Sequence, residues 1–477
     1  MDQDFHYYGT YYAARVGGGL DATDATLVGK AANFIDFLSE TAYAGYWKLV
    51  RESRPKPSGD YTEVGEIANP RYTFQGGLTG TGVSPEDGLW CSYHFMPGNY
   101  ADPAGTPSPT AVHGFAVARE LPAPPKQGVR LHHELRDVKK TIGVAQARLL
   151  NRPQSPLSRA LLADTHRSVL DADRLEAILK RAIGASELLP DSRQERLRLV
   201  QRFGLILLGV RAHVIADTWA HQDFSGISHE MNTYYDVNGS NWGRQSIDYQ
   251  DVGGEWKNVV LSSLKHDNLK AVPNGTSYLG HGWMGHFPDY SFAKFRYRPW
   301  WRDQSAAPIV RDNPGQYRHA FLELCSLMSK AGGREFNPST QRNALAAAQR
   351  AIVSPCEIAK STVCPRAHSA VAWQREMQRA GFGPPDDIID AKLEPDPKAV
   401  LPGMVVTSHN VTRYGTYVVC ASSDLYLFQI AADYHFHFVR HYLRQNGILN
   451  FTGSWSTKLG PLANTISDLF EPVRKAA

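Results

Sequence analysis

Three side chains that bind metals well lie four residues apart in one apolar stretch of this chain. His213, Asp217 and His221 occupy the i, i+4 and i+8 positions of a run rich in leucine, isoleucine and valine. Each four-residue step on an α-helix turns about 400°, so the three side chains drift only about 40° apart and share one face. Imidazole and carboxylate groups are preferred ligands of zinc and related divalent ions. Because polar groups on a buried helix need partners, the pattern predicts a metal site.

Further histidines and acids stand in settings that favour ligation, among aromatic, apolar or glycine-rich neighbours. Taken singly, each has an ordinary alternative: Asp36 could cap a helix or pair with a lysine, and His94 could be a hydrogen-bonded member of an aromatic cluster. Three donors on one buried helix face are harder to explain separately, so the set favours a shared site. The further candidates are, in chain order, Asp2, Asp4, His6, Asp36, His94, His281, His286 and Asp289.

The composition is that of an ordinary globular protein. The 477 residues are 42% hydrophobic and 21% charged, with a formal net charge of +4, which is too mild to argue for a nucleic-acid partner. No apolar segment reaches the roughly 18 residues of a membrane span. The first residues lack the basic and apolar regions of a signal peptide. We therefore expect a cytoplasmic protein, or one exported without a classical signal peptide.

Several classes of enzyme lack their usual sequence signatures here. The chain has no GxSxG, P-loop or GxGxxG set in a strand–helix context, which disfavours nucleophile-elbow and nucleotide-fold chemistry. Its five cysteines are scattered and form no CxxC pair, so neither a disulfide framework nor a thiolate zinc site is expected. Metal-assisted chemistry through histidine and carboxylate is the class that the residues favour.

Helical periodicity dominates the chain and predicts a mainly α fold with little β structure. We expect residues 1–314 to form a helical domain with long loops at 53–126 and 223–252. Residues 315–477 are expected to form a helical extension with a small hairpin at 401–420, packed on the first domain. A further irregular region is expected at 273–314. The helices are predicted at 21–50, 127–151, 157–186, 191–222, 253–270, 315–331, 338–354, 366–381 and 421–446.

The order of the donors resembles the zinc-dependent phospholipase C and single-strand nuclease superfamily. The opening Asp-Phe-His-Tyr-Tyr-Gly-Thr-Tyr and the later Gly-His…Pro-Asp segment also resemble an uncharacterised bacterial family related to it. The resemblance covers scattered motifs within about residues 1–300. It implies a multi-helix fold, two to three zinc ions, and hydrolysis of phosphoester bonds. The ligands that it implies are Met1, His6, Asp36, His94, His213, Asp217, His221, His281 and either His286 or Asp289.

Three features depart from that family's pattern. The central motif has three residues between Asp217 and His221, fewer than the commonest family spacing. The family's first ligand is usually a tryptophan exposed by removal of a signal peptide, whereas this chain begins with Met1. Methionine before aspartate is generally retained, so the Met1 amine could serve, with Asp2 or Asp4 as replacements. The last motif lacks a clear His-x3-acid pair, because Asp289 follows His286 by only three residues. The ligands of the third ion therefore stay open at this point.

The resemblance predicts a phospholipase C-like hydrolase in which a metal-bridged hydroxide attacks phosphorus. We expect Asp217 and Asp36 to act as catalytic carboxylates, Asp223 to orient imidazoles, and a phospholipid or other phosphodiester to be the substrate. The basic and aromatic run 292–301 could contact a membrane surface or stack nucleic-acid bases. The alternatives are a single-strand nuclease, a non-enzymatic helical protein with a structural zinc site, and an exported effector. The predicted phosphate-binding residues are Arg211, Arg296 and Arg298.

Overall fold

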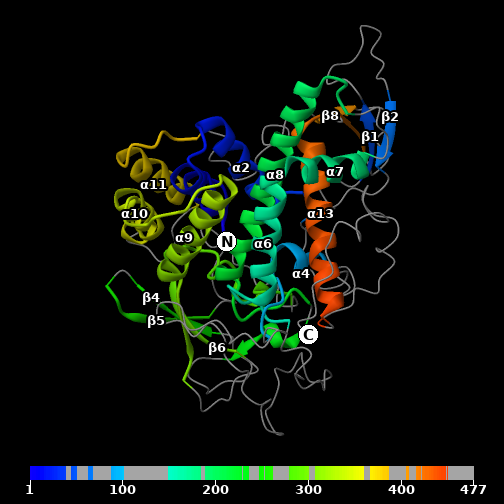
Figure 1. Cartoon of the computed structure of the whole chain (residues 1–477). Helices are drawn as coiled ribbons and strands as arrows, with labels where there is room; N and C mark the ends of the chain where they lie inside the picture. Colours follow the sequence, from blue (N-terminus) through cyan, green and yellow to red (C-terminus); the bar gives the residue numbers. More distant parts are fainter. Residues whose placement is uncertain are drawn as a thin grey trace, which may run out of the picture.

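A computed structural model gives the fold, and it confirms a mainly helical protein (Figure 1). The predicted helix at 127–151 lies almost entirely outside the described residues, as do most of the loop at 53–126 and residues Trp300 and Trp301. The structure describes residues 1–38, 45–50, 63–67, 73, 88–100, 149–183, 189–227, 229–235, 246–251, 253–260, 279–299, 307–358, 366–385, 404–407, 415–420, 422–446 and 448.

One long helix, α8 (Arg193–Ala220), forms the centre of the core. Ser192 caps its first turn by accepting a hydrogen bond from the amide of Glu195, and its second half is buried on nearly every side. α2 (Ala22–Phe34), α9 (Asn313–Ala331) and α13 (Asp424–Gln445) pack around it. Figure 1 shows α8 and α13 side by side. The helix predicted at 191–222 is therefore confirmed, and its apolar residues are those of a core helix.

A glycine lets α2 approach α8 closely. A Cβ atom at Gly209 would lie only 2.5 Å from the carbonyl oxygen of Val28 and 2.7 Å from the Cβ of Ala31. No ordinary side chain fits there without moving one of the helices. This contact brings the end of α2, and Asp36 just beyond it, next to His213.

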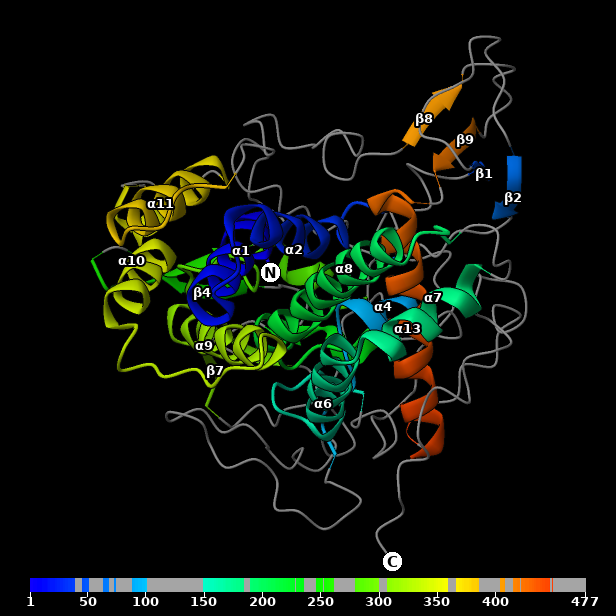
Figure 2. The ribbon, with the colours of Figure 1, turned by 45° about the horizontal axis from the view of Figure 1, so that its top comes forward.

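The N-terminal segment is helical and buried. Residues Asp4–Gly9 (η1), Thr10–Ala13 (α1) and Ala14–Gly18 (η2) follow one another without a break and lie against α2, α9 and α11. The N-terminus lies within the molecule (Figures 1 and 2), and Met1 is only 5% exposed. The sequence periodicity did not predict this helix, because buried residues lie on nearly all of its sides and leave no polar face.

Most of the remaining helices follow the predicted order with shifted ends. Two predictions are wrong in part, because the segment 53–126, expected to be a loop, contains a short helix at 89–93, and residues 45–50 of the helix predicted at 21–50 form a strand. The stretch predicted as one helix at 157–186 is two, because Asp171 adopts an extended conformation and its carboxylate caps the next helix through the amide of Arg174. The predicted helix at 21–50 ends at Phe34 in α2. The other helices are α4 (Leu89–Tyr93), α6 (Pro156–Leu170), α7 (Ala172–Ile183), α10 (Arg342–Ile358) and α11 (Arg366–Arg379), with single turns η6 (Glu230–Asn232) and η8 (Gly282–Met284).

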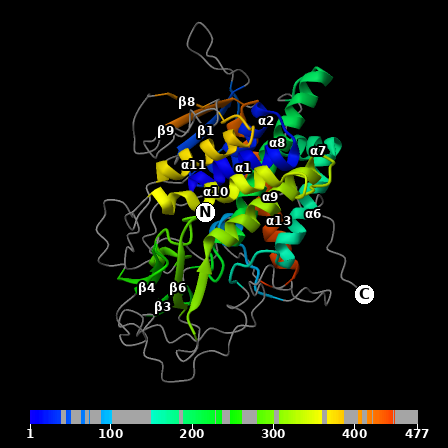
Figure 3. The same ribbon diagram turned by 90° about the vertical axis from the view of Figure 1, so that its left-hand side faces the viewer.

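Two small sheets lie at opposite ends of the helical body (Figures 1 and 3). One has the strand order β2-β1-β9-β8, and the other has the order β3-β6-β4-β5 with β7 beside β6. The hairpin predicted at 401–420 is confirmed by β8 and β9, which pair antiparallel. The strands are β1 (Gly45–Val50), β2 (Glu63–Ile67), β3 (Tyr234–Tyr235), β4 (Ser246–Gln250), β5 (Trp256–Val260), β6 (Lys294–Pro299), β7 (Ile309–Asp312), β8 (Met404–Thr407) and β9 (Gly415–Cys420).

The second sheet corrects three predictions. The helix predicted at 253–270 begins as strand β5, and both irregular regions, 223–252 and 273–314, contain strands. In β6 basic residues alternate with Phe295 and Tyr297, and exposed positions alternate with buried ones. This period of two is typical of a half-buried strand. The aromatic content of the segment concealed that alternation.

One apolar core includes residues from Met1 to Leu443, so the helices of the predicted C-terminal extension share it with the N-terminal ones. α8 is an exception to the expected absence of membrane-length segments, because by length and composition alone it is apolar enough to cross a bilayer. The apolar window of this helix is 83% buried inside the molecule, as in the core helix of a globular protein.

Candidate metal centre

Donor groups from distant parts of the chain converge beside the second half of α8. They form three sets whose ligand atoms lie within 4.8 Å of one another. The three sets contain every histidine and aspartate predicted as a metal ligand, with Asp289 in place of His286, and the Met1 amine lies between two of the sets. The three sets are His6, His213 and Asp217; Asp36, His94 and His213; and His221, His281 and Asp289.

Asp217 is the centre of this arrangement. Its side chain is 1% exposed, and its two oxygens face different donors. Oδ1 lies 3.1 Å from Nε2 of His6, and Oδ2 lies 3.2 Å from Nε2 of His213 and 3.4 Å from Nδ1 of His94. The ligands of a tetrahedral ion with bonds of 2.0–2.2 Å are about 3.3–3.6 Å apart. The observed separations of 3.1, 3.2 and 3.4 Å lie within or slightly below this range, so small shifts would fit these donors around shared metal ions.

Four imidazoles are held from behind by backbone carbonyls. In each, one ring nitrogen donates its hydrogen to a carbonyl oxygen, so the other nitrogen presents a lone pair to the cluster. Metal-binding histidines usually have such a partner on the far nitrogen, which fixes the tautomer and the ring orientation. The pairs are His213 Nδ1 with the Ala32 carbonyl (2.9 Å), His221 Nδ1 with that of His94 (2.7 Å), His281 Nδ1 with that of Gly285 (2.7 Å), and His94 Nε2 with that of Thr73 (2.9 Å).

His6 completes the first set from the N-terminal helix. Its ring stacks on that of His213, with centroids 3.7 Å apart and planes 18° from parallel. Neither ring nitrogen makes a well-directed hydrogen bond within the part of the chain that the structure describes. Burial, reinforced by His213 and the Met1 amine, holds the pKa of His6 well below its ordinary value. A neutral, fully buried imidazole whose nitrogens make no well-directed hydrogen bond within the described chain is a candidate metal ligand.

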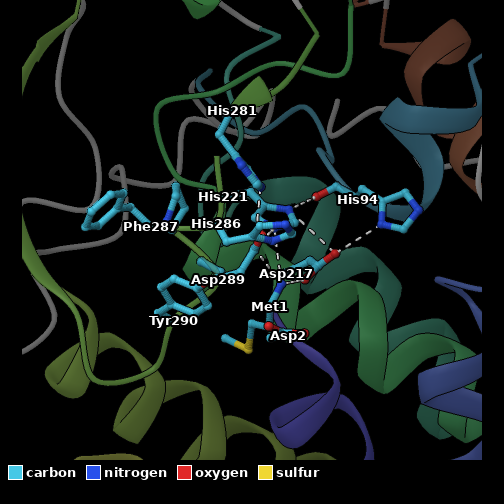
Figure 4. Close-up of polar contacts among 12 residues, drawn as sticks. Met1, Asp2, His94, Asp217, His221, His281, His286, Phe287, Asp289 and Tyr290 are labelled. Atoms are coloured by element: carbon cyan, nitrogen blue, oxygen red, sulfur yellow. Dashed lines mark hydrogen bonds and ion pairs between the residues drawn. The ribbon is translucent and has the colours of Figure 1, made fainter. Parts of the chain in front are cut away.

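The amine of Met1 lies at the junction between the first and third sets. It is 2.5 Å from Oδ1 of Asp217, 3.3 Å from Oδ1 of Asp289 and 3.1 Å from Nε2 of His221 (Figure 4). Burial opposes a charge on this amine, but the carboxylates of Asp217, Asp289 and Asp36 raise its pKa to about 11. The protonated amine therefore supplies positive charge to the carboxylates of Asp217 and Asp289. The N-terminal group at the site is the Met1 amine, and neither Asp2 nor Asp4 takes its place.

The third set resolves the choice between His286 and Asp289. Oδ1 of Asp289 lies 3.0 Å from Nε2 of His221 and 3.4 Å from Nε2 of His281. His286 is 28% exposed and contacts Oδ2 of Asp289 at 3.5 Å from the outside (Figure 4). Asp289 is thus the third-set donor, while His286 lies at its rim.

A glycine and an aromatic ring position this third set. Gly280 has φ +55°, and a Cβ atom there would lie 2.1 Å from the Phe95 ring. The same ring stacks on His221, with centroids 4.6 Å apart. Phe95 therefore fits between the backbone that carries His281 and the imidazole of His221.

The charges of the set match those of metal ligands. Although burial opposes their ionisation, the pKa values of Asp217 and Asp289 stay well below the usual range because of His221 and His281, respectively, together with the Met1 amine. Burial lowers the pKa of His221 to about 4. Ionised carboxylates and neutral imidazoles are the forms that bind a divalent ion.

Two of the three predicted phosphate-binding arginines have other side-chain partners. Arg211 is fully buried on α8, where it pairs with Asp164 at 3.1 Å and lies over the ring of Phe438, so it is a core residue. Arg296 donates a hydrogen bond through Nε to Asp248 and forms an ion pair with it through Nη2. The backbone of Arg298 lies opposite Tyr235 in the sheet, and its Nε has no hydrogen-bond partner within the described chain. Among the described residues, no ion pair or hydrogen bond joins these arginines to the cluster, so phosphate binding stays a prediction for Arg296 and Arg298.

Two residues near the end of α8 have structural roles that sequence reasoning missed or misassigned. Asp223, expected to orient imidazoles, instead accepts hydrogen bonds from Arg152 and Tyr297. Arg311, from β7, donates to the carbonyls of Trp219, Ala220 and Gln222. It thereby caps α8 at the turn that carries His221. No local sequence signal could identify a cap that comes from a strand about 90 residues away.

Comparisons with known proteins give one match. A family described as a family of unknown function (DUF6765) matches residues 1–443. No curated protein and no solved structure matches the chain. The function of this chain is therefore inferred from the geometry of its site.

Proposed function

The chain belongs to a family of unknown function (DUF6765), and from its site we propose that it is a zinc-dependent phosphoester hydrolase. One observation carries the proposal. The four imidazoles already use their far nitrogens on backbone carbonyls, so their lone pairs and three carboxylates face one another. A cluster of lone pairs and negative charges needs cations, and the Met1 amine is only one.

Zinc is the ion that this donor set suits best. The donors are imidazole nitrogens and carboxylate oxygens without thiolates, which zinc binds in tetrahedral sites. Each of the three sets offers three side chains, and two sets share His213. Three protein ligands leave one position for water or substrate, as in catalytic sites, whereas structural zinc sites are closed by four. We therefore propose two to three ions with catalytic rather than structural roles.

Three side chains at the site have different proposed roles in the reaction. When bound, the zinc ions supply a hydroxide at neutral pH and positive charge for the phosphate oxygens. Asp217, fully buried between donors of two sets, fixes their spacing. Asp36 is 26% exposed and lies 3.7 Å from Nδ1 of His94, so it is the most accessible of the three carboxylates to solvent and substrate. His286, at the rim, is placed to meet the substrate.

A phospholipid is the substrate that the surface favours over a nucleic acid. Arg296 and Val310 are cross-strand neighbours on the outer face of the second sheet, where Arg296 also pairs with the buried carboxylate of Asp248. Trp256 is 36% exposed on β5 with Arg296 over its ring, and Val310 is 55% exposed. Exposed tryptophan, arginine and aliphatic side chains together are favoured at a membrane interface. A base-stacking role for the same sheet would make the protein a single-strand nuclease instead.

Metal analysis tests the centre itself. Purified protein should contain two to three zinc ions per chain, and His213→Ala should lose at least one, because His213 belongs to two sets. His437→Ala is the matched control, since His437 and Asp433 are also a buried i, i+4 pair, 3.6 Å apart on α13. It should keep all the metal. Folded wild-type protein without bound metal, or equal losses in both variants, would contradict the proposal.

Activity assays separate the functional classes. Phosphatidylcholine vesicles, single-stranded DNA and a chromogenic phosphodiester should be tested in parallel, with hydrolysis of the vesicles expected to be fastest. A chelator should remove activity while the circular dichroism spectrum persists. Faster cleavage of DNA would assign the nuclease function. No hydrolysis of any substrate by metal-loaded protein, together with unfolding by the chelator, would assign a structural site.

A further inference from the structure

A cavity lies on the side of α8 that faces away from the metal centre. Its volume is about 510 Å³, and it is a groove between α6 and α9 that has Trp219 as its floor. The two helices contact each other and α8 (Figure 2). Trp219 follows Asp217 by two residues, a rotation of about 200° on a helix, so it faces away from the metal ligands.

The rim of this groove is rich in positive charge. Arg159 and His166 line it from α6, and Lys330 lines it from α9. Within the described chain, Lys330 is exposed and forms no ion pair, and Nε2 of His166 is buried without a hydrogen-bond partner. Burial and the nearby Lys330 ammonium lower the pKa of His166. An ammonium without an ion pair and a nearby imidazole nitrogen without a hydrogen-bond partner, which donates when it carries the ring hydrogen, would both gain from an anion.

The single acid among the described lining residues does not neutralise this charge. Glu323 accepts a hydrogen bond from Nε1 of Trp219 at 2.5 Å. Burial raises the pKa of Glu323 to about 7, so its carboxyl group is only partly ionised at neutral pH. The groove therefore keeps a net positive charge.

The inner part of the groove is apolar. Leu162, Leu322 and Leu327 line it together with the Trp219 indole. At one end Gln154 holds a left-handed backbone conformation (φ +53°), and its carbonyl accepts a hydrogen bond from Arg159 at 2.6 Å. Non-glycine residues rarely adopt this conformation, and such positions cluster at ligand sites.

We propose that this groove binds a small organic anion, whose apolar body lies on Trp219 and the leucines and whose anionic head meets Lys330 and His166. A cavity of this size accommodates a ligand of drug-like dimensions. The proposal is independent of the zinc chemistry, because none of the groove residues belongs to the metal sets.

Calorimetric titration of the full chain tests the proposal. The probes are octanoate and octyl phosphate, which distinguish the two head groups, with octanol and inorganic phosphate as partial ligands. We expect at least one amphiphilic anion to bind at a single site, at least tenfold more tightly than octanol or phosphate. Lys330→Glu should weaken this binding at least tenfold. Arg318→Glu, a charge reversal at an exposed position of the same helix outside the groove, should leave it unchanged.

A volume change tests the location separately from the charge. Ala163 is exposed on the groove wall, so Ala163→Trp should fill the groove and abolish binding without altering the charges. The proposal would be overturned by the absence of saturable binding of either amphiphile, or by octanol binding as tightly as the anions. Wild-type affinity in Lys330→Glu or in Ala163→Trp would also overturn it.

Discussion

The buried Met1 amine makes a sharp prediction about the N-terminus. Adding a Gly-Ser dipeptide ahead of Met1 converts the amine into an amide, which has neither a positive charge nor a basic lone pair. The amine nitrogen is 2.5 Å from Asp217, 3.3 Å from Asp289 and 3.1 Å from His221. The extension therefore removes a cation from two buried carboxylates and has to pass through a closely packed region.

The magnitude follows from that burial. Removing one partner of a buried ion pair costs about 3–5 kcal/mol, because the other charge is left uncompensated. An unfolding entropy of about 2.1 cal/mol/K per residue means that 1 kcal/mol shifts the Tm of a chain of this length by about 1 °C. Without metal, we expect the extended protein to melt about 3–5 °C lower. With zinc present, it should also hold at least one ion fewer, because zinc can displace the proton of an amine and use its lone pair, whereas the amide nitrogen has no such lone pair.

Differential scanning fluorimetry in EDTA and metal analysis after zinc loading measure these two effects. The reference is protein cleaved to begin at Met1, and the matched control carries the same dipeptide after Ala477. Equal Tm values and equal metal content in the extended and reference proteins would refute the assignment of the Met1 amine to the site.

Three other substitutions have defined outcomes. Gly280→Ala forces a side chain into the Phe95 ring at a backbone position with positive φ. The free energy of unfolding should therefore fall by about 1–3 kcal/mol, and the zinc content should fall by one ion. An unchanged zinc content in atomic absorption would count against the third set. Gly209→Ala should destabilise the fold by about 1–3 kcal/mol, because α2 must move away from α8 to make room for the new side chain. This loss should exceed the gain from the higher helix propensity of alanine. Urea unfolding measures the effect, and a gain in stability would contradict the close contact. Burial raises the pKa of Glu323 from 4.5 to about 7, so the proton it holds stabilises the fold below pH 4.5 and this contribution is lost as the pH rises through 7. Glu323→Gln keeps a neutral group that can accept a hydrogen bond from Trp219. The variant should therefore be about 1–3 kcal/mol more stable than wild type at pH 8 and should differ little from it at pH 5. An equal effect at both pH values in thermal melts would refute the pKa assignment.

The parts of the site that the sequence predicted are those that depend on neighbours along one helix. His213, Asp217 and His221 share a face because α8 turns by a fixed angle per residue, and its apolar residues require burial. The resemblance of the donor order to a known superfamily extended this prediction to His6, Asp36, His94 and His281. Their convergence could not come from periodicity, because separate segments of the chain carry them.

The tertiary structure decided which groups meet. Gly209 lets α2 approach α8, and the turn after Gly280 places Asp289 rather than His286 against His221 and His281. Arg211 resembled a phosphate ligand in the sequence because it lies two residues from His213, yet helix geometry turns it toward Asp164 in the core.

Local sequence thus determined most of the described helices and the donor side chains that α8 carries on one face, since side-chain spacing and burial preference act over a few residues. The choice of partners depended on contacts between segments far apart in the chain, including backbone carbonyls that any residue can supply. That is why the carbonyl partners of the imidazoles, the Arg311 cap and the groove over Trp219 became visible only in the folded molecule.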